Sequence, residues 1–258
     1  MSGVLRAELR KITTIRLWWI MLICTLVLSG GYAAGVALLQ PDTGAPFQDP
    51  GIVRSIYNGG NPVARVLAVV LGVAAMGFEY RHHTLAATYL ATPRRSRVLL
   101  GKVSSLLLFG TLYGVLSVLS GVAAAAPFLL SNDGSFFLDR ADTWRSLILG
   151  VLSLVLWTMF GMGIGILIKN LLVAMLVGIS FTYLLEPIVS MLFFLRGWES
   201  ALNVTPTGAT NAMLGITSPV LFAAHQPITW GQGALVLAAW TLLPAIIGMM
   251  SSVRRDVT

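Results

Sequence analysis

The sequence predicts an all-α membrane protein, and its composition, the length of its apolar runs and its charge distribution each support that fold class. Of the 258 residues, 56% are hydrophobic and only 10% are charged, whereas a water-soluble domain carries about 25% charged residues. So few charges cannot cover a surface in water, which places the chain in a membrane. Its apolar runs are continuous rather than alternating, so they predict helices and exclude the short strands of an outer-membrane barrel.

Six runs are long enough to cross a bilayer, which takes about 20 apolar residues. They cover residues 17–39, 62–79, 103–130, 145–168, 171–194 and 231–252. We therefore predict six transmembrane helices. No internal repeat or linker divides the chain, so we expect one domain over residues 1–258. The single cysteine, Cys24, lies in the first run and rules out an intramolecular disulfide.

Lysine and arginine gather on one side of this predicted topology. Six spans put both termini on the same side, together with the connector 77–102 and the turn at 169–170. Twelve of the seventeen basic residues then lie there: Arg6, Arg10, Lys11, Arg16, Arg81, Arg94, Arg95, Arg97, Lys102, Lys169, Arg254 and Arg255. Because cytoplasmic loops carry the excess of Lys and Arg, both termini are predicted to be cytoplasmic. The excess of basic residues is thus a topological signal. The chain has no basic surface with interleaved aromatic residues, so we do not predict a nucleic-acid partner.

The segment before the first span has two faces. In residues 1–16, Leu5, Leu9 and Ile12 share one side of a helix while Arg6 and Arg10 share another. This spacing predicts an amphipathic helix lying in the membrane interface. The alternative is a basic flank that only sets orientation.

Two segments predicted on the outer side differ in composition. Residues 40–62 are rich in Pro and Gly and are expected to be irregular. Residues 195–230 are too apolar for a plain loop, so we expect interfacial or re-entrant helices there. Within the spans, three glycine pairs fit G-x-x-x-G and predict close helix contacts: Gly31 with Gly35, Gly110 with Gly114, and Gly161 with Gly165.

Few residues could carry chemistry. The three histidines and one cysteine do not have the spacing of a metal site, and no phosphate-binding loop is present. We therefore expect no catalytic residue, no metal and no cofactor bound by this chain. Glu186 is the one acid well inside a span, where ionisable groups are often functional. It could contact a transported substrate, pair with Arg65 or Arg196, or sit near the outer surface in a structural role.

The connector "FEYRHHTLAATYLATPRRSRVLLGK" has internal order. It predicts a short helix over about 83–92, which Thr84 starts and Pro93 stops. Glu79 precedes the helix, and Leu85 and Tyr89 form an apolar ridge on it. Arg94, Arg95 and Arg97 form a cationic border after it. Such a helix suits docking into a groove on a cytoplasmic partner. Contact with anionic membrane lipid would explain the charge but not the helix or its stop.

This connector resembles the segment between spans two and three of type-2 ABC transporter permeases, particularly the small bacterial permeases of antibiotic exporters. The family pattern is matched in order by Glu79, Tyr80, Arg81, Thr84, Pro93, Arg94, Ser96, Arg97 and Lys102, while His83 stands where Gly is usual. The amphipathic start, the six spans and the broken apolar segment before the last span also fit.

The resemblance implies a transmembrane subunit of an ABC exporter in the bacterial inner (cell) membrane. A second permease chain, identical or different, would complete the pathway, and two cytoplasmic ATPase subunits would bind ATP and magnesium. The segment 80–100 would couple them to the spans through Glu79, Tyr80, Arg81, Thr84, Leu85, Tyr89, Pro93, Arg94, Arg95 and Arg97. The cargo would be a hydrophobic or amphipathic antibiotic, drug or peptide. Lipid or glycolipid export is an alternative, as is a non-transporting membrane anchor for a cytoplasmic complex.

Overall fold

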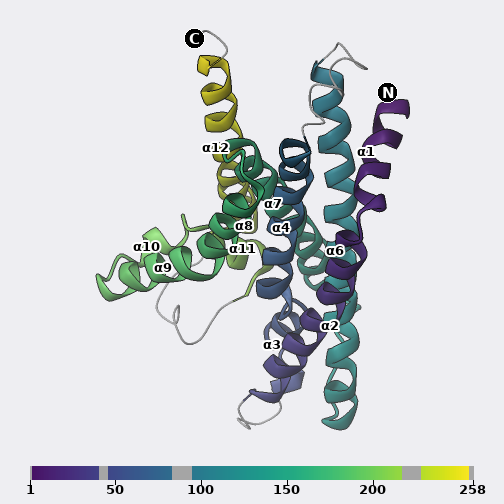
Figure 1. The fold of residues 1–258 in the computed structure, drawn as a ribbon. Coiled ribbons are helices and arrows are strands. Elements are labelled where there is room, and N and C mark those ends of the chain that lie inside the picture. Colours follow the sequence, from purple (N-terminus) through teal and green to yellow (C-terminus); the bar gives the residue numbers. More distant parts are fainter. Residues whose placement is uncertain (1, 41–45, 83–94, 217–227, 256–258) are drawn as a thin grey trace.

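The computed structural model describes residues 2–40, 46–82, 95–216 and 228–255, and the regular elements in these ranges are all helical (Figure 1). In chain order they are α1 (Ser2–Thr14), α2 (Leu17–Leu38), a 3-10 turn (Pro46–Gln48), α3 (Pro50–Tyr57), α4 (Asn61–Arg81), α6 (Arg95–Ser131), α7 (Ala141–Leu167), α8 (Leu171–Ser180), a π-helical turn (Phe181–Leu185), α9 (Glu186–Leu195), α10 (Glu199–Leu202), α11 (Pro206–Leu214) and α12 (Trp230–Arg255). Six stretches are long and apolar enough to cross a membrane: α2, α3 with α4, α6, α7, α8 with α9, and α12. The prediction of six membrane-spanning helices is confirmed.

The start of α1 and the end of α12 lie at the same end of the bundle, at the top of Figure 1. Helix α4 ends and α6 begins at this end as well, at Arg81 and Arg95. We call it the connector end. The predicted helix over 83–92 lies outside the described residues.

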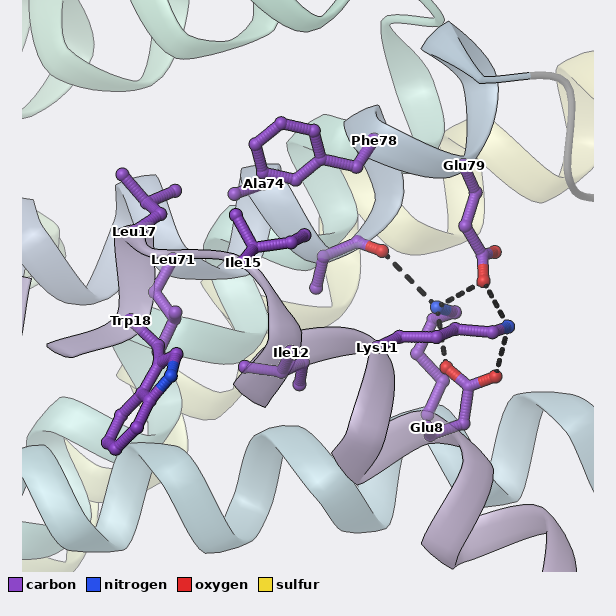
Figure 2. A pocket seen from close by; sticks show the side chains of 12 residues that line it. Glu8, Lys11, Ile12, Ile15, Leu17, Trp18, Leu71, Ala74, Phe78 and Glu79 are labelled. Carbon is purple, nitrogen blue, oxygen red and sulfur yellow. Dashed lines mark hydrogen bonds and ion pairs between the residues drawn. The ribbon is translucent and has the colours of Figure 1, made fainter.

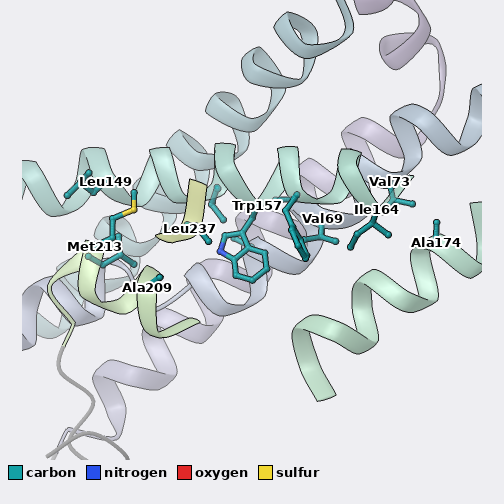
Figure 3. Close-up of a cluster of buried hydrophobic side chains, with 14 of the residues drawn as sticks. Val69, Val73, Leu149, Trp157, Ile164, Ala174, Ala209, Met213 and Leu237 are labelled. Atoms are coloured by element: carbon teal, nitrogen blue, oxygen red, sulfur yellow. The ribbon is translucent and has the colours of Figure 1, made fainter. Parts of the chain in front are cut away.

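Helices α4 and α7 form the centre of the bundle. In the span that contains α4 and in the span formed by α7, 72% of the most apolar stretch is buried inside the bundle. The corresponding share is 22% for α2 and for α8 with α9. Gly161 of α7 allows the closest approach, because a Cβ there would lie 2.1 Å from the carbonyl oxygen of Val69. The main apolar core lies along this contact and extends to α11 and α12 (Figure 3).

Two of the three predicted glycine contacts are confirmed. Gly161 and Gly165 of α7 pack against α4, and Gly110 and Gly114 of α6 pack against Val155 and Val151 of α7. A Cβ at Gly31 or Gly35 of α2 would meet no atom of another helix within 4 Å, so the third pair makes no close contact with the described part of the chain.

The prediction of an irregular segment over 40–62 is wrong in its second half, where α3 forms. Asp49 caps this helix, its Oδ1 accepting from Gly51 N at 2.6 Å and Ile52 N at 3.4 Å, and Pro50 occupies the first helical position. The Asp-Pro pair thus starts a helix instead of breaking one. Gly60 follows and allows close contact with α2, since a Cβ there would lie 2.3 Å from Ser29 Oγ.

The third and fifth predicted spans differ in detail from the expectation. Helix α6 begins at Arg95 rather than 103, so Arg95, Arg97 and Lys102 belong to the same helix as the span. The fifth span is interrupted by the π turn before Glu186. Pro187 explains the interruption, because it lacks the N–H that would bond to the preceding turn.

Two apolar side chains of helix α1 pack on protein. Leu9 and Ile12 contact a cluster formed by Leu71, Phe109 and Tyr113, whereas Arg6 and Arg10 are exposed. Within the predicted segment 195–230, α11 is buried against α7 and α12, and residues 217–227 lie outside the described part.

Candidate functional site

Four charged side chains meet at the connector end, and we call them the connector cluster: Glu8, Lys11, Glu79 and Lys102. Figure 2 shows the first three of them labelled. Lys11 Nζ lies 2.6 Å from Glu8 Oε1 and 2.7 Å from Glu79 Oε1. Lys102 Nζ lies 2.9 Å from Glu8 Oε2 and 3.0 Å from Glu79 Oε1. Each lysine therefore bridges both glutamates, and acids and bases alternate around the cluster.

Three helices bring these groups together. Glu79 is in the last turn of α4, Lys102 is near the start of α6, and Glu8 and Lys11 lie three residues apart on α1. Gly101 lets α1 approach α6, because a Cβ there would lie 2.8 Å from Val4 Cγ1. As a result, α1 is ion-paired to both helices that flank the connector.

Burial and charge pairing act in opposite directions on the ionisation of this cluster. Burial alone would raise the pKa of Glu8, but the ammonium groups of Lys102 and Lys11 outweigh it and lower that pKa below its ordinary value. For Lys11, burial acts to lower the pKa, and the carboxylates of Glu79 and Glu8 outweigh it and raise the pKa. Both groups therefore keep their charges at neutral pH.

An apolar pocket adjoins the connector cluster (Figure 2). Its apolar lining comes from the junction of α1 with α2 and from one side of α4: Ile12, Ile15, Leu17, Trp18, Leu71, Ala74, Ala75 and Phe78. The four charged side chains line one end of the pocket.

The residues predicted for coupling are placed as follows. Glu79 is buried in the connector cluster, Tyr80 is half-buried, and Arg81 and Arg97 are exposed where α4 ends and α6 begins. Thr84, Leu85, Tyr89, Pro93 and Arg94 lie outside the described residues. Sequence reasoning did not assign Glu8 or Lys11 to a site. The available signal was an acid three residues before a lysine, inside an otherwise basic segment.

A second polar cluster lies deeper in the bundle, formed by Glu186, Thr207 and Arg65, and we call it the clasp. Thr207 Oγ1 donates to Glu186 Oε2 at 2.6 Å, and Thr207 N donates to Glu186 Oε1 at 3.1 Å. Arg65 Nη1 donates to Thr207 Oγ1 from the other side. The guanidinium also lies 5.5 Å from the ring centre of Trp157, in cation–π contact.

The clasp joins Glu186 to Arg65 through a hydroxyl. Both charged residues are buried, at 4% and 8% exposure. Of the possibilities considered for Glu186, the structure shows a contact with Arg65 through Thr207, while Arg196 is exposed at the end of α9. The carboxylate also meets the start of α11, where backbone N–H groups have no intrahelical acceptor. Thr207 was missed because its partner is 21 residues away along the chain. Contact of Glu186 with a transported substrate stays a prediction.

The described residues contain no group of three or more His, Cys, Asp or Glu side chains that could hold a metal ion. No protein-family model matches this chain, and no curated protein matches its sequence. What the two clusters can do is therefore inferred from their geometry and chemistry.

Proposed function

We propose that this chain is the transmembrane subunit of an ATP-driven exporter of the type-2 ABC kind, which moves a hydrophobic or amphipathic compound out of a bacterial cell. The observation that carries the proposal is the connector cluster. It joins the two flanks of the basic connector, Glu79 on α4 and Lys102 on α6, at 3.0 Å and pairs both with α1.

A connector mounted in this way can transmit force. A buried charge left without its partner typically costs about 3–5 kcal/mol, so the ends of α4 and α6 resist being pulled apart. A push on the connector would move both helix ends together instead of bending the loop alone. Because α4 packs along α7 with backbone-to-backbone contacts at Gly161, the displacement would reach the centre of the bundle. A loop that only marks topology requires no such mounting.

The proposed complex needs partners for energy and for the pathway. Two cytoplasmic ATPase subunits would bind the connector end and supply ATP hydrolysis with magnesium, and the Lys and Arg asymmetry supports a cytoplasmic location for that end. A second permease chain, identical or different, would complete the pathway. The exposed apolar side chains of α2 and of α8 with α9 leave surface for this chain and for lipid.

The decisive experiment asks whether the connector binds and stimulates an ATPase. The chain would be purified with a candidate ATPase, with Arg94, Arg95 and Arg97 replaced by Glu. A matched control replaces Arg140, Arg145 and Arg196, which lie away from the connector end, and changes the charge equally. We expect the connector variant to lose both association and stimulated ATP hydrolysis, and the control to retain both.

Retained association and stimulation in the connector variant would contradict the proposal. An intact complex in vesicles that hydrolyses ATP but moves no compound would favour a membrane anchor instead. The compounds that stimulate ATP hydrolysis would distinguish antibiotic or peptide cargo from lipid or glycolipid cargo.

A further inference from the structure

Helix α9 leaves the bundle immediately after the π turn and projects away from it together with α10 (Figure 1). Glu186, the first residue of α9, is its one buried residue. The apolar residues that follow are exposed, as Ile188 at 54%, Leu192 at 54% and Leu195 at 66% show. Helix α9 packs on the π turn and on α10. Its hold on the rest of the bundle is therefore concentrated at Glu186.

The element that Glu186 binds is itself firmly placed. Ala209 and Met213 of α11 lie in the main apolar core beside Leu237 of α12 (Figure 3). Gly233 of α12 brings the two backbones together, because a Cβ there would lie 2.6 Å from the carbonyl oxygen of Ala209. The clasp thus connects a projecting helix to a fixed one.

The clasp is built from hydrogen bonds through Thr207 rather than from a direct ion pair. Arginine and carboxylate side chains usually pair through two parallel hydrogen bonds. Here the hydroxyl of Thr207 lies between them, and Arg65 Nε is buried without a partner among the described residues. The two bonds from Thr207 to Glu186 can therefore break without separating a direct ion pair.

The adjoining backbone offers a place to bend. A π-helical turn inside a helix is rare, is frequent at functional sites and is a place where helices kink, and Phe181–Leu185 is such a turn directly before Glu186. The missing N–H of Pro187 weakens the helical hydrogen bonding at the same point.

We propose that the clasp is a latch that sets the angle at which α9 leaves the bundle, and that α9 swings about the π turn when the latch opens. Opening breaks the bonds from Thr207 to Glu186, which releases the base of α9 while α11 stays in the core. This inference does not depend on the proposed transport function, because it concerns the motion of one helix within the isolated chain.

Hydrogen exchange tests the bond at the base of the latch. The Thr207 amide is the first N–H of α11, because Pro206 has none, and it is protected by Glu186, whereas the neighbouring Gly208 amide donates to Thr205 Oγ1 at 3.0 Å. In Glu186→Ala we expect exchange at Thr207 to accelerate by about tenfold or more, because no intrahelical acceptor replaces the carboxylate. Exchange at Gly208 should stay unchanged. Equal protection of Thr207 in wild type and variant would overturn the latch.

Distance measurements test the swing itself. In a Cys24→Ser background, spin labels at Met191 on α9 and Leu235 on α12 would report the angle of α9. We expect one narrow distance in the wild type and a second or much broader one in Glu186→Ala and Thr207→Val. Thr207→Ser keeps the hydroxyl, and Ser190→Ala removes only a 3.4 Å bond from within α9, so both should match the wild type.

A single wild-type distance in Glu186→Ala, despite faster exchange at Thr207, would show a helix cap without a hinge and would overturn the proposal. Should Glu186→Ala fail to fold, Thr207→Val decides alone, because it keeps both charges and the approximate shape of the side chain. An unchanged distance in that variant would also overturn the proposal.

Discussion

The connector cluster and the clasp both bury opposite charges where helices meet, yet they are built differently. The connector cluster holds two acids and two bases with nitrogen–oxygen distances between 2.6 and 3.0 Å. In the clasp the single acid and the single base are kept apart by a hydroxyl. Direct, shared ion pairs hold three helices as one unit. In the clasp, hydrogen bonds through Thr207 hold one projecting helix, and they can break without separating a direct ion pair.

Helix α4 contributes to both clusters. Glu79 lies 14 residues after Arg65 (79 − 65 = 14), which is about four turns and about 21 Å along a helix. The two residues therefore lie on nearly the same face of a buried helix. A displacement of α4 at the connector end would therefore also displace Arg65 in the clasp.

Of the variants that test this comparison, Lys102→Met should lower the free energy of unfolding most. It leaves Glu8 and Glu79 buried with Lys11 as their shared counter-ion, so we expect the free energy of unfolding in detergent to fall by about 3–5 kcal/mol. Arg97→Met, an exposed change on the same helix, should lower it by less than about 0.5 kcal/mol. Similar losses in both variants would show that the net charge of α6, and not the cluster, is what stabilises the fold.

Arg65→Met should have the next largest effect, about 2–3 kcal/mol, because Glu186 then keeps only hydrogen-bond donors as compensation for its buried charge. Adding Glu186→Gln should restore part of this loss by removing the unpaired charge. Unfolding of the wild type, both single variants and the double variant measures the coupling. If the two losses simply add, the relay through Thr207 carries no electrostatic coupling.

Lys11→Met should cost no more than about 1 kcal/mol, because its side chain is 38% exposed and its pairs are weakened by solvent. Lys102, with a side chain only 6% exposed, remains to bridge both acids. The same unfolding measurement tests this difference within one cluster. A loss as large as that of Lys102→Met would show that burial does not set the strength of these pairs.

A change of pH near neutrality should have the smallest effect on the docking of α1. The lowered pKa of Glu8 makes its stabilisation complete above its ordinary value of 4.5 and lost as pH falls through the lowered folded-state pKa. The raised pKa of Lys11 makes its stabilisation complete below 10.5 and lost as pH rises through the raised folded-state pKa. Spin labels at Ala7 and Leu99 should therefore report a constant distance between about pH 6 and pH 9. A transition inside that range would contradict this assignment of charges.

Several features were predictable from the order of residues because they depend on local composition. The first span was expected over 17–39 and is found at Leu17–Leu38. Helix α3 was missed because Asp49 and Pro50 suit a loop as well as a helix start, and the packing of Tyr57 against the bundle selects the helix. The start of α6 was misplaced because polarity was taken to end the span, although charged residues continue a helix readily beyond the apolar run.

Hydrophobicity and charge are properties of each residue in turn, so the chain alone was enough to indicate six helices able to span a membrane, a basic segment between the second and third of them and one acid within a span. Which charged groups meet depends on how helices pack. Lys102 reaches Glu8 across 94 residues, and Thr207 reaches Glu186 only because the start of α11 folds back to the start of α9. These contacts are set by the close approach of backbones at small residues such as Gly101 and by the bend at the π turn. No pattern along the chain specifies such pairings, because their geometry exists only once the helices are in place.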